Sequence, residues 1–174
     1  MAAKGKPKKK PKKAASADPE IVHLARGIAL LKSRRTSQAL VEFDKALRLN
    51  PGNVEAHYLL GNVFMYKNDM DKAAVEYRRT LELDGKHADA RHNLAVILTD
   101  KGLLDDAERE FKKTVEVDPE YAEAYSNIGL ISCKRGQWAE DIKNFKKALE
   151  LDPGRELIKS NLRFAEEQMK KGKL

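Results

Sequence analysis

Leu49-Asn50-Pro51-Gly52 is the first of four related stretches in this chain. The others are Leu83-Asp84-Gly85-Lys86, Val117-Asp118-Pro119-Glu120 and Leu151-Asp152-Pro153-Gly154, each beginning 34 residues after the last. An aromatic residue recurs with the same spacing at Phe43, Tyr77, Phe111 and Phe145, and a small residue recurs at Gly27, Gly61, Ala95 and Gly129. Because several independent positions share one period, the chain contains an internal repeat of 34 residues.

The apolar residues within each unit are spaced as on helices. Val54, Tyr58, Gly61 and Met65, for example, advance by three or four positions. The stretches Lys67-Asn68-Asp69, Lys101-Gly102 and Lys134-Arg135-Gly136 interrupt the pattern in the middle of successive units. Between units, an Asp followed by Pro is typical of a helix N-cap with Pro in the first turn. Each unit is therefore predicted to be a helix–turn–helix.

The pattern resembles the tetratricopeptide repeat, W-x2-L-G-x2-Y…A-x3-F…P over 34 residues. The resemblance implies an all-α fold, a right-handed α-solenoid of nine helices without strands. Its parts are a solenoid over 18–169, with repeats at 20–53, 54–87, 88–121 and 122–155 and a capping helix at 156–169, and a basic C-terminal end at 170–174. One departure stands out: Asp141 replaces the alanine found at Ala39, Ala73 and Ala107, and a charge at a helix crossing is destabilising unless it faces outward.

The charge of the chain is unevenly distributed. Its 174 residues carry 34 Lys and Arg against 27 Asp and Glu, a net charge of +7, but residues 1–17 hold seven lysines and no acid. Without that segment, basic and acidic residues balance at 27 each. A segment so charged and so poor in apolar residues is predicted to be disordered. The lysines of this basic tail are Lys4, Lys6, Lys8, Lys9, Lys10, Lys12 and Lys13.

Several classes of protein are disfavoured. The single cysteine, Cys133, cannot form an internal disulfide, and no phosphate-binding loop, nucleophile elbow, zinc-protease or calcium-loop motif occurs. His23 and His57 stand at the first aromatic position of the motif and are expected to be packing residues. We therefore expect no enzyme activity, no cofactor and no metal. Without a signal peptide or a long apolar run, the expected location is cytoplasmic, or nuclear in a eukaryote.

The resemblance also implies a binding surface, because in this family the first helix of each unit lines a concave groove. The corresponding candidates are Ile21, Leu24, Ile28, Leu31, Tyr58, Asn62, Met65, Tyr66, Asn93, Asn127 and Asn161. The last three lie 34 residues apart, and their amides could pair with the backbone of an extended peptide, since an amide both donates and accepts. The alternative is that these asparagines are repeat consensus without a ligand. Glu123 and Asn127 stand where the family's carboxylate clamp has Lys and Arg, which disfavours that clamp.

The sequence therefore predicts a non-catalytic adaptor or scaffold that binds a peptide segment of a protein partner in the concave groove. Three alternatives stay open. The basic tail could bind anionic lipid or nucleic acid, the chain could be an accessory subunit of an enzyme complex, or the apolar first repeat could self-associate.

Overall fold

The computed structural model describes residues 18–172, and within them the chain forms nine helices and no strand. The first unit holds α1 (Pro19–Lys32) and α2 (Thr36–Leu49). The second unit, which starts at Gly52, holds α3 (Val54–Tyr66), α4 (Met70–Leu83), α5 (Ala88–Asp100), α6 (Leu104–Val117), α7 (Ala122–Lys134), α8 (Trp138–Leu151) and α9 (Glu156–Lys171). The predicted all-α fold is confirmed. The basic tail at 1–17 lies outside the described residues.

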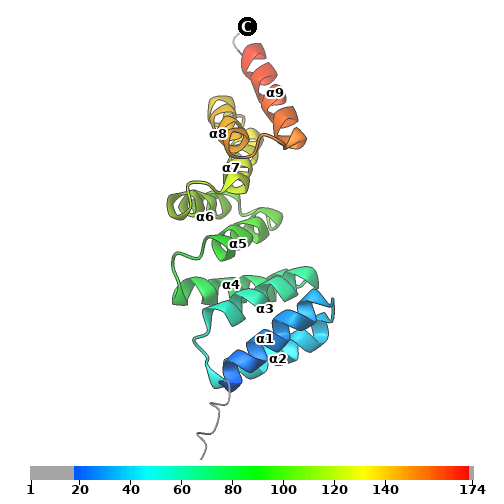
Figure 1. Cartoon of the computed structure of the whole chain (residues 1–174). Coiled ribbons are helices and arrows are strands. Elements are labelled where there is room, and N and C mark those ends of the chain that lie inside the picture. The colour runs from blue at the N-terminus through cyan, green and yellow to red at the C-terminus, as the bar shows by residue number, and fades with distance from the viewer. Residues whose placement is uncertain (1–17, 173–174) are drawn as a thin grey trace, which may run out of the picture. The chain divides into compact units, whose positions relative to one another are not determined.

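Within the second unit, each helix packs on the one before it and the one after it (Figure 1). The pairs α3–α4, α5–α6 and α7–α8 form the antiparallel hairpins of three successive repeats. Helices α4 and α6 each contact the first helix of the next hairpin, and α8 contacts α9. Asn68, Gly102 and Gly136 take positive φ angles of 60°, 75° and 70° in the turns within the repeats. These are the residue types that adopt such angles at least cost, so the mid-unit interruptions of the sequence are turns.

An aromatic ring packed on a small residue forms the core of each hairpin. Tyr77 is fully buried, and a Cβ on Gly61 would lie 2.5 Å from its ring. Phe145 packs in the same way on Gly129, where a Cβ would lie 2.7 Å from the ring. The recurring glycine therefore lets the two helices of a hairpin approach with the aromatic ring between them. In the first unit, the same contact joins Gly27 to Phe43.

The acidic residues between repeats do not cap the following helix as predicted. Asp18 does cap α1, with Pro19 at the first helical position. Asp118, however, ends α6, and α7 begins only at Ala122. The Asp118 carboxylate accepts a hydrogen bond from the Glu120 backbone N–H at 3.0 Å, and Asp84 and Asp152 make equivalent bonds. The prediction was wrong because an Asp before Pro favours such a turn as well as a helix N-cap.

Helix α9 occupies the place predicted for the capping helix and ends two residues later, at Lys171. Ile158 and Ala165 are buried, whereas Leu157 and Phe164 are 73% and 49% exposed. The Phe164 ring lies edge-on to Trp138, with ring centroids 6.0 Å apart. One side of α9 thus closes the core of the fourth repeat, while large apolar side chains remain exposed on another side.

Candidate functional site

Two of the predicted amides belong to a hydrogen-bonded cluster between neighbouring first helices. The Tyr77 hydroxyl donates to Asn62 Oδ1 at 2.7 Å. The Asn93 amide nitrogen, on α5, donates to Asn62 Oδ1 and to the Tyr77 hydroxyl, at 3.3 Å each. The aromatic core residue of the other three repeats is Phe, so the second repeat alone has a hydroxyl at this position. The cluster holds the Asn93 amide with its nitrogen directed into the protein.

Asn127, one repeat later, is held in a similar way by His92. The Asn127 amide nitrogen lies 3.2 Å from His92 Nε2. Burial lowers the pKa of His92, so the ring is neutral at pH 7 and its Nε2 accepts from the amide. The nitrogens of Asn93 and Asn127 therefore both have partners within the protein. The contacts of the described residues do not join Asn161, which is half-buried on α9, to this arrangement.

Two pairs of aromatic rings recur with the period of the repeat. Tyr58 on α3 lies against His87, with ring centroids 4.5 Å apart. His92 on α5 lies against Tyr121, with centroids 4.8 Å apart. Positions 58 and 92 are separated by 34 residues, as are 87 and 121, so Tyr and His exchange places between repeats. The sequence analysis did not select His87 or Tyr121 as site residues, although their shared period was visible.

A carboxylate stands beside these rings at the second residue of each first helix. Glu55, Asp89 and Glu123 occupy this position on α3, α5 and α7. The Tyr121 hydroxyl donates to Asp89 Oδ1 at 3.0 Å, and Arg155 pairs with Glu123. Burial, together with the neighbouring Asp89, raises the pKa of the Tyr121 hydroxyl. We call this surface of α3, α5 and α7 the first-helix face, defined by Glu55, Tyr58, Asn62, Asp89, His92, Asn93, Glu123 and Asn127.

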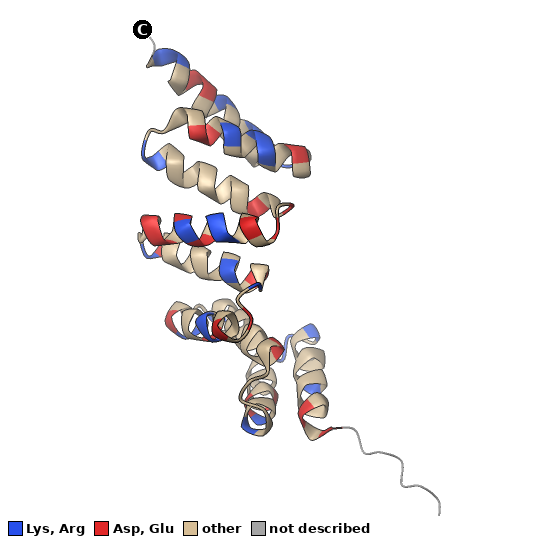
Figure 2. Cartoon of the chain, turned by 90° about the vertical axis from the view of Figure 1, so that its left-hand side faces the viewer, with Lys and Arg blue, Asp and Glu red and all other residues tan. Residues whose placement is uncertain are grey.

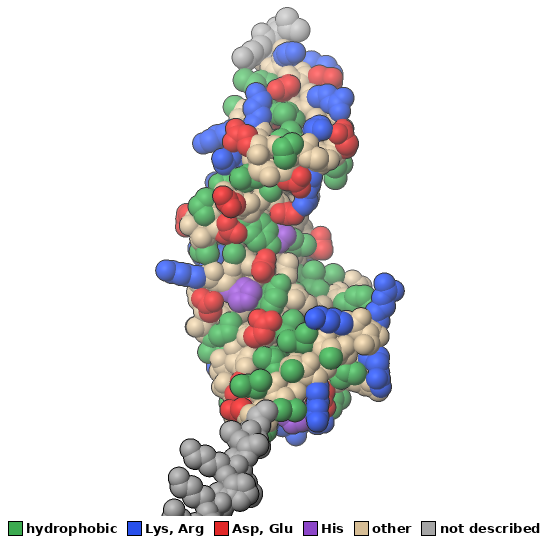
Figure 3. Space-filling view, viewed as in Figure 1, with side chains coloured by type: hydrophobic (Ala, Val, Ile, Leu, Met, Phe, Trp, Pro, Cys, Tyr) green, Lys and Arg blue, Asp and Glu red, His purple; other side chains and the backbone are tan. Residues whose placement is uncertain are grey.

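The first-helix face is poor in basic side chains. On α3 there is no Lys or Arg, and Arg91 on α5 is 12% exposed and paired with Glu110 at 2.6 Å. On α7 the one basic residue is Lys134, at the end of the helix. Figure 2 shows the contrast as helices banded in blue and red beside helices that are largely tan, and Figure 3 shows acidic, histidine and hydrophobic side chains grouped over the middle of the molecule. The net charge of this face is therefore negative.

The remaining predicted groove residues differ in exposure. Met65 packs against the core, whereas Tyr66 is 72% exposed. In the first unit, Ile21 is 60% exposed, and Leu24, Ile28 and Leu31 are half-buried along one side of α1. Two exposed apolar residues that were not selected, Leu130 and Phe164, lie 34 residues apart on α7 and α9.

The first aromatic position of the motif carries a side chain that contacts a glutamate of the second helix in three repeats. His23 Nδ1 lies 2.7 Å from Glu42, His57 Nδ1 lies 2.7 Å from Glu76, and Arg91 takes the same place beside Glu110. The separation is 19 residues each time. His23 and His57 are half-buried, and each also binds the second helix of its own repeat. The fourth repeat has Tyr125 and Asn144 at these positions.

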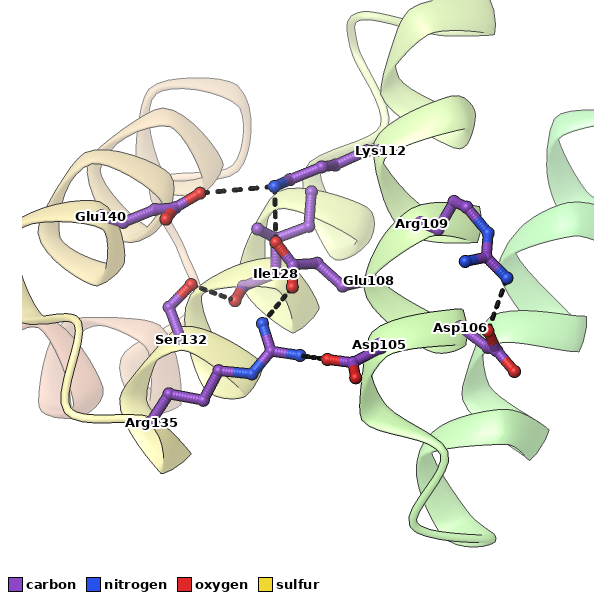
Figure 4. Close-up of polar contacts among 9 residues, drawn as sticks. All are labelled: Asp105, Asp106, Glu108, Arg109, Lys112, Ile128, Ser132, Arg135 and Glu140. Atoms are coloured by element: carbon purple, nitrogen blue, oxygen red, sulfur yellow. Dashed lines mark hydrogen bonds and ion pairs between the residues drawn. The ribbon is translucent and has the colours of Figure 1, made fainter.

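A second set of ion pairs links successive repeats near the second helices. Arg135, which follows α7, pairs with Asp105 and Glu108 on α6 (Figure 4). Lys112 joins Glu108 to Glu140 of α8, the latter at 3.6 Å. One repeat earlier, Lys101 pairs with Asp71, at positions 34 residues before Arg135 and Asp105. These bridges hold adjacent hairpins together and leave the first-helix face free of their charges.

Comparisons with known proteins identify the family of the chain. Three tetratricopeptide repeat models match residues 24–88, 64–128 and 122–151. The chain belongs to the tetratricopeptide repeat family. A search of the curated proteins gives no significant match.

Solved structures of tetratricopeptide repeat (TPR) proteins share the fold. One crystal structure of MamA superposes with a TM-score of 0.79 at 20% identity, over 87% of this chain and 82% of MamA. A second MamA structure gives a TM-score of 0.72 at 29% identity, over 79% of this chain and 81% of the MamA chain. The Pseudomonas aeruginosa PilF structure gives a TM-score of 0.75 at 23% identity, over 88% of this chain and 70% of the PilF chain. The TPR family and fold support a general role in protein binding.

Two further findings concern only the described residues. None of the helices between residues 18 and 172 is long and apolar enough to span a membrane. In the same part of the chain, no group of three or more His, Cys, Asp and Glu side chains is placed to hold a metal ion.

Proposed function

We propose that this TPR protein is a non-catalytic adaptor that binds an extended segment of a partner protein on the first-helix face. The observation that carries the proposal is the fixed orientation of Asn93 and Asn127. Each amide nitrogen has a partner within the protein, and in this proposal each Oδ1 is the group that accepts from the ligand. Acceptors spaced by one repeat suit the backbone N–H groups of an extended chain, whatever its side chains.

Apolar side chains beside these amides would supply anchoring area. Met65 and Tyr66 lie at the end of α3, and Leu130 and Phe164 lie towards the other end of the second unit. Exposed apolar residues beside oriented polar groups are typical of protein interaction sites. The predicted anchor on Ile21, Leu24, Ile28 and Leu31 lies in the first unit and stays a separate prediction.

Selection from a peptide-display library tests the proposal. We expect the full chain to select peptides whose binding decreases when Asn93 and Asn127 are both changed to Ala. Asn144→Ala is the matched control, because Asn144 lies on α8 and its amide nitrogen binds the Glu140 backbone carbonyl of its own helix. Peptides that bind the wild type and the Asn93→Ala/Asn127→Ala variant equally well would place the site on another surface and contradict the proposal.

Deletion of residues 1–17 separates this function from binding by the basic tail. If the adaptor proposal holds, the deleted chain retains the selected peptides. If the tail carries the function, binding to anionic vesicles or to DNA is lost with the deletion and decreases steeply with salt.

A further inference from the structure

Carboxylates line the first-helix face in a row that follows the repeat, at Glu55, Asp89 and Glu123. The nitrogens of Asn93 and Asn127 beside them have partners within the protein. Donors are scarce on this face, since the Tyr121 hydroxyl already donates to Asp89 and the Tyr77 hydroxyl to Asn62. A ligand that matches these groups must supply donors.

Aromatic rings accompany the carboxylates. The ring pairs Tyr58–His87 and His92–Tyr121 are half-buried beside Glu55 and Asp89. A ring face next to a carboxylate attracts a Lys or Arg side chain in two ways, through the ring quadrupole and through the charge. Because both pairs occupy equivalent positions 34 residues apart, the same environment occurs twice along the face.

We propose that the first-helix face of α3, α5 and α7 selects a cationic segment of a partner protein, with Lys or Arg side chains placed against the two ring pairs. This inference rests on the proposed function and names the chemistry of its ligand. An acidic segment would be repelled by the carboxylate row, and a neutral segment would gain nothing from the negative charges of Glu55 and Asp89. The positive charge of the partner is therefore the source of selectivity, while the amides bind its backbone.

The first experiment uses three short synthetic peptides that differ in one residue type. In the Lys peptide, Lys alternates with Thr. The Gln peptide and the Glu peptide have the same sequence with every Lys replaced by Gln or by Glu. Fluorescence anisotropy with the full chain is expected to give binding of the Lys peptide, at least about tenfold weaker binding of the Gln peptide, and no binding of the Glu peptide; tenfold corresponds to about 1.4 kcal/mol. Equal binding of the Lys and Gln peptides, or binding of none, overturns the inference.

Paired variants separate selective binding from general attraction between charges. Glu55→Gln with Asp89→Asn removes two charges from the first-helix face. We expect this double variant to bind the Lys peptide about tenfold more weakly, because partly screened ion pairs contribute up to about 1 kcal/mol each. Asp106→Asn with Glu116→Gln removes the same charge from α6 and should change the affinity less than twofold. Equal losses in the two double variants would overturn the inference.

Two outcomes distinguish a failure of the cationic-ligand inference from a failure of the proposed adaptor function. If display selection returns neutral or acidic peptides that depend on Asn93 and Asn127, the adaptor function stands and the cationic ligand is wrong. If the Lys peptide binds only after residues 1–17 are deleted, the lysines of this chain are the occupant, and the proposal of a separate partner is overturned.

Discussion

Asp141 on α8 and Ala107 on α6 occupy the same position in successive repeats, and both side chains are fully buried. Neither carboxylate oxygen of Asp141 has a hydrogen-bond partner. A buried carboxylate without partners strongly prefers its neutral form, and burial raises the pKa of Asp141 from 3.8 to about 6. The Asp141 side chain therefore faces inward, which is the arrangement that the sequence analysis described as destabilising.

The first prediction is that Asp141→Ala stabilises the protein at neutral pH. The folded state binds the Asp141 proton more tightly than the unfolded state, so the free energy of unfolding decreases as the pH rises from about 4 to about 6. Above that range the ionised carboxylate lowers the free energy of unfolding by an amount on the order of 3 kcal/mol, which corresponds to a pKa shift of Asp141 from 3.8 to about 6. Thermal unfolding of the two proteins between pH 4 and 8 should give a difference that grows with pH and then levels off.

The reverse substitution is the control for this prediction. Ala107→Asp places a carboxylate at the equivalent crossing of the third repeat and should destabilise the protein most at neutral pH. The thiol of Cys133 gives a second readout, because its pKa is raised first by burial and then by the charge of Asp141. Removal of that charge should increase the reaction rate of the thiol at pH 8. A stability difference that does not vary with pH would contradict the assignment.

The second prediction concerns the ion pairs between repeats. Arg135→Ala should lower the melting temperature, because Arg135 links the end of α7 to Asp105 and Glu108 on α6. Arg109→Ala is the matched control, since Arg109 pairs with Asp106 within the same helix (Figure 4). The loss caused by Arg135→Ala should be the larger and should shrink in high salt. Equal effects of the two substitutions would mean that the bridge between repeats contributes little.

Much of this fold could be predicted because one period governs it. The 34-residue spacing of the glycine and the aromatic residue located every hairpin, and the helices follow from it. The beginning of each helix after a repeat boundary could not be assigned in the same way, because the hydrogen bonds that distinguish an Asp turn from a helix N-cap involve backbone groups two or three residues away.

The candidate site was less predictable because partners that are distant in sequence decide its chemistry. The motif identified Asn93 and Asn127, but which end of each amide is free depends on Tyr77 and His92. Tyr77 counted only as a core aromatic, because its hydroxyl contacts become apparent only when α3 and α5 are placed side by side.

The third prediction tests the role of that hydroxyl. Tyr77→Phe restores the residue type of the other repeats and removes the bonds to Asn62 and Asn93. The stability loss should be small, about 1 kcal/mol, because one neutral hydrogen-bonded group is removed. The free energy of binding of a peptide selected on the first-helix face should decrease by more than the free energy of unfolding, because the Asn93 amide loses its fixed orientation. Phe111→Tyr serves as the control, and unchanged peptide affinity in Tyr77→Phe would show that the orientation of Asn93 does not matter.

The last prediction concerns the apolar side of α1. Leu24 and Ile28 are half-buried on this helix, and Ile21 beside them is 60% exposed. We expect Leu24→Asp with Ile28→Asp to abolish either self-association or partner binding, because a carboxylate in an apolar contact must be desolvated. Sedimentation equilibrium and peptide affinity distinguish the two: a dimer that becomes a monomer indicates self-association through the first repeat, and a monomer that loses its peptide indicates that α1 contributes to peptide binding. Val41→Asp, on the exposed side of α2 in the same unit, should change neither property. If the double variant also leaves both unchanged, α1 takes no part in binding and the predicted apolar anchor is wrong.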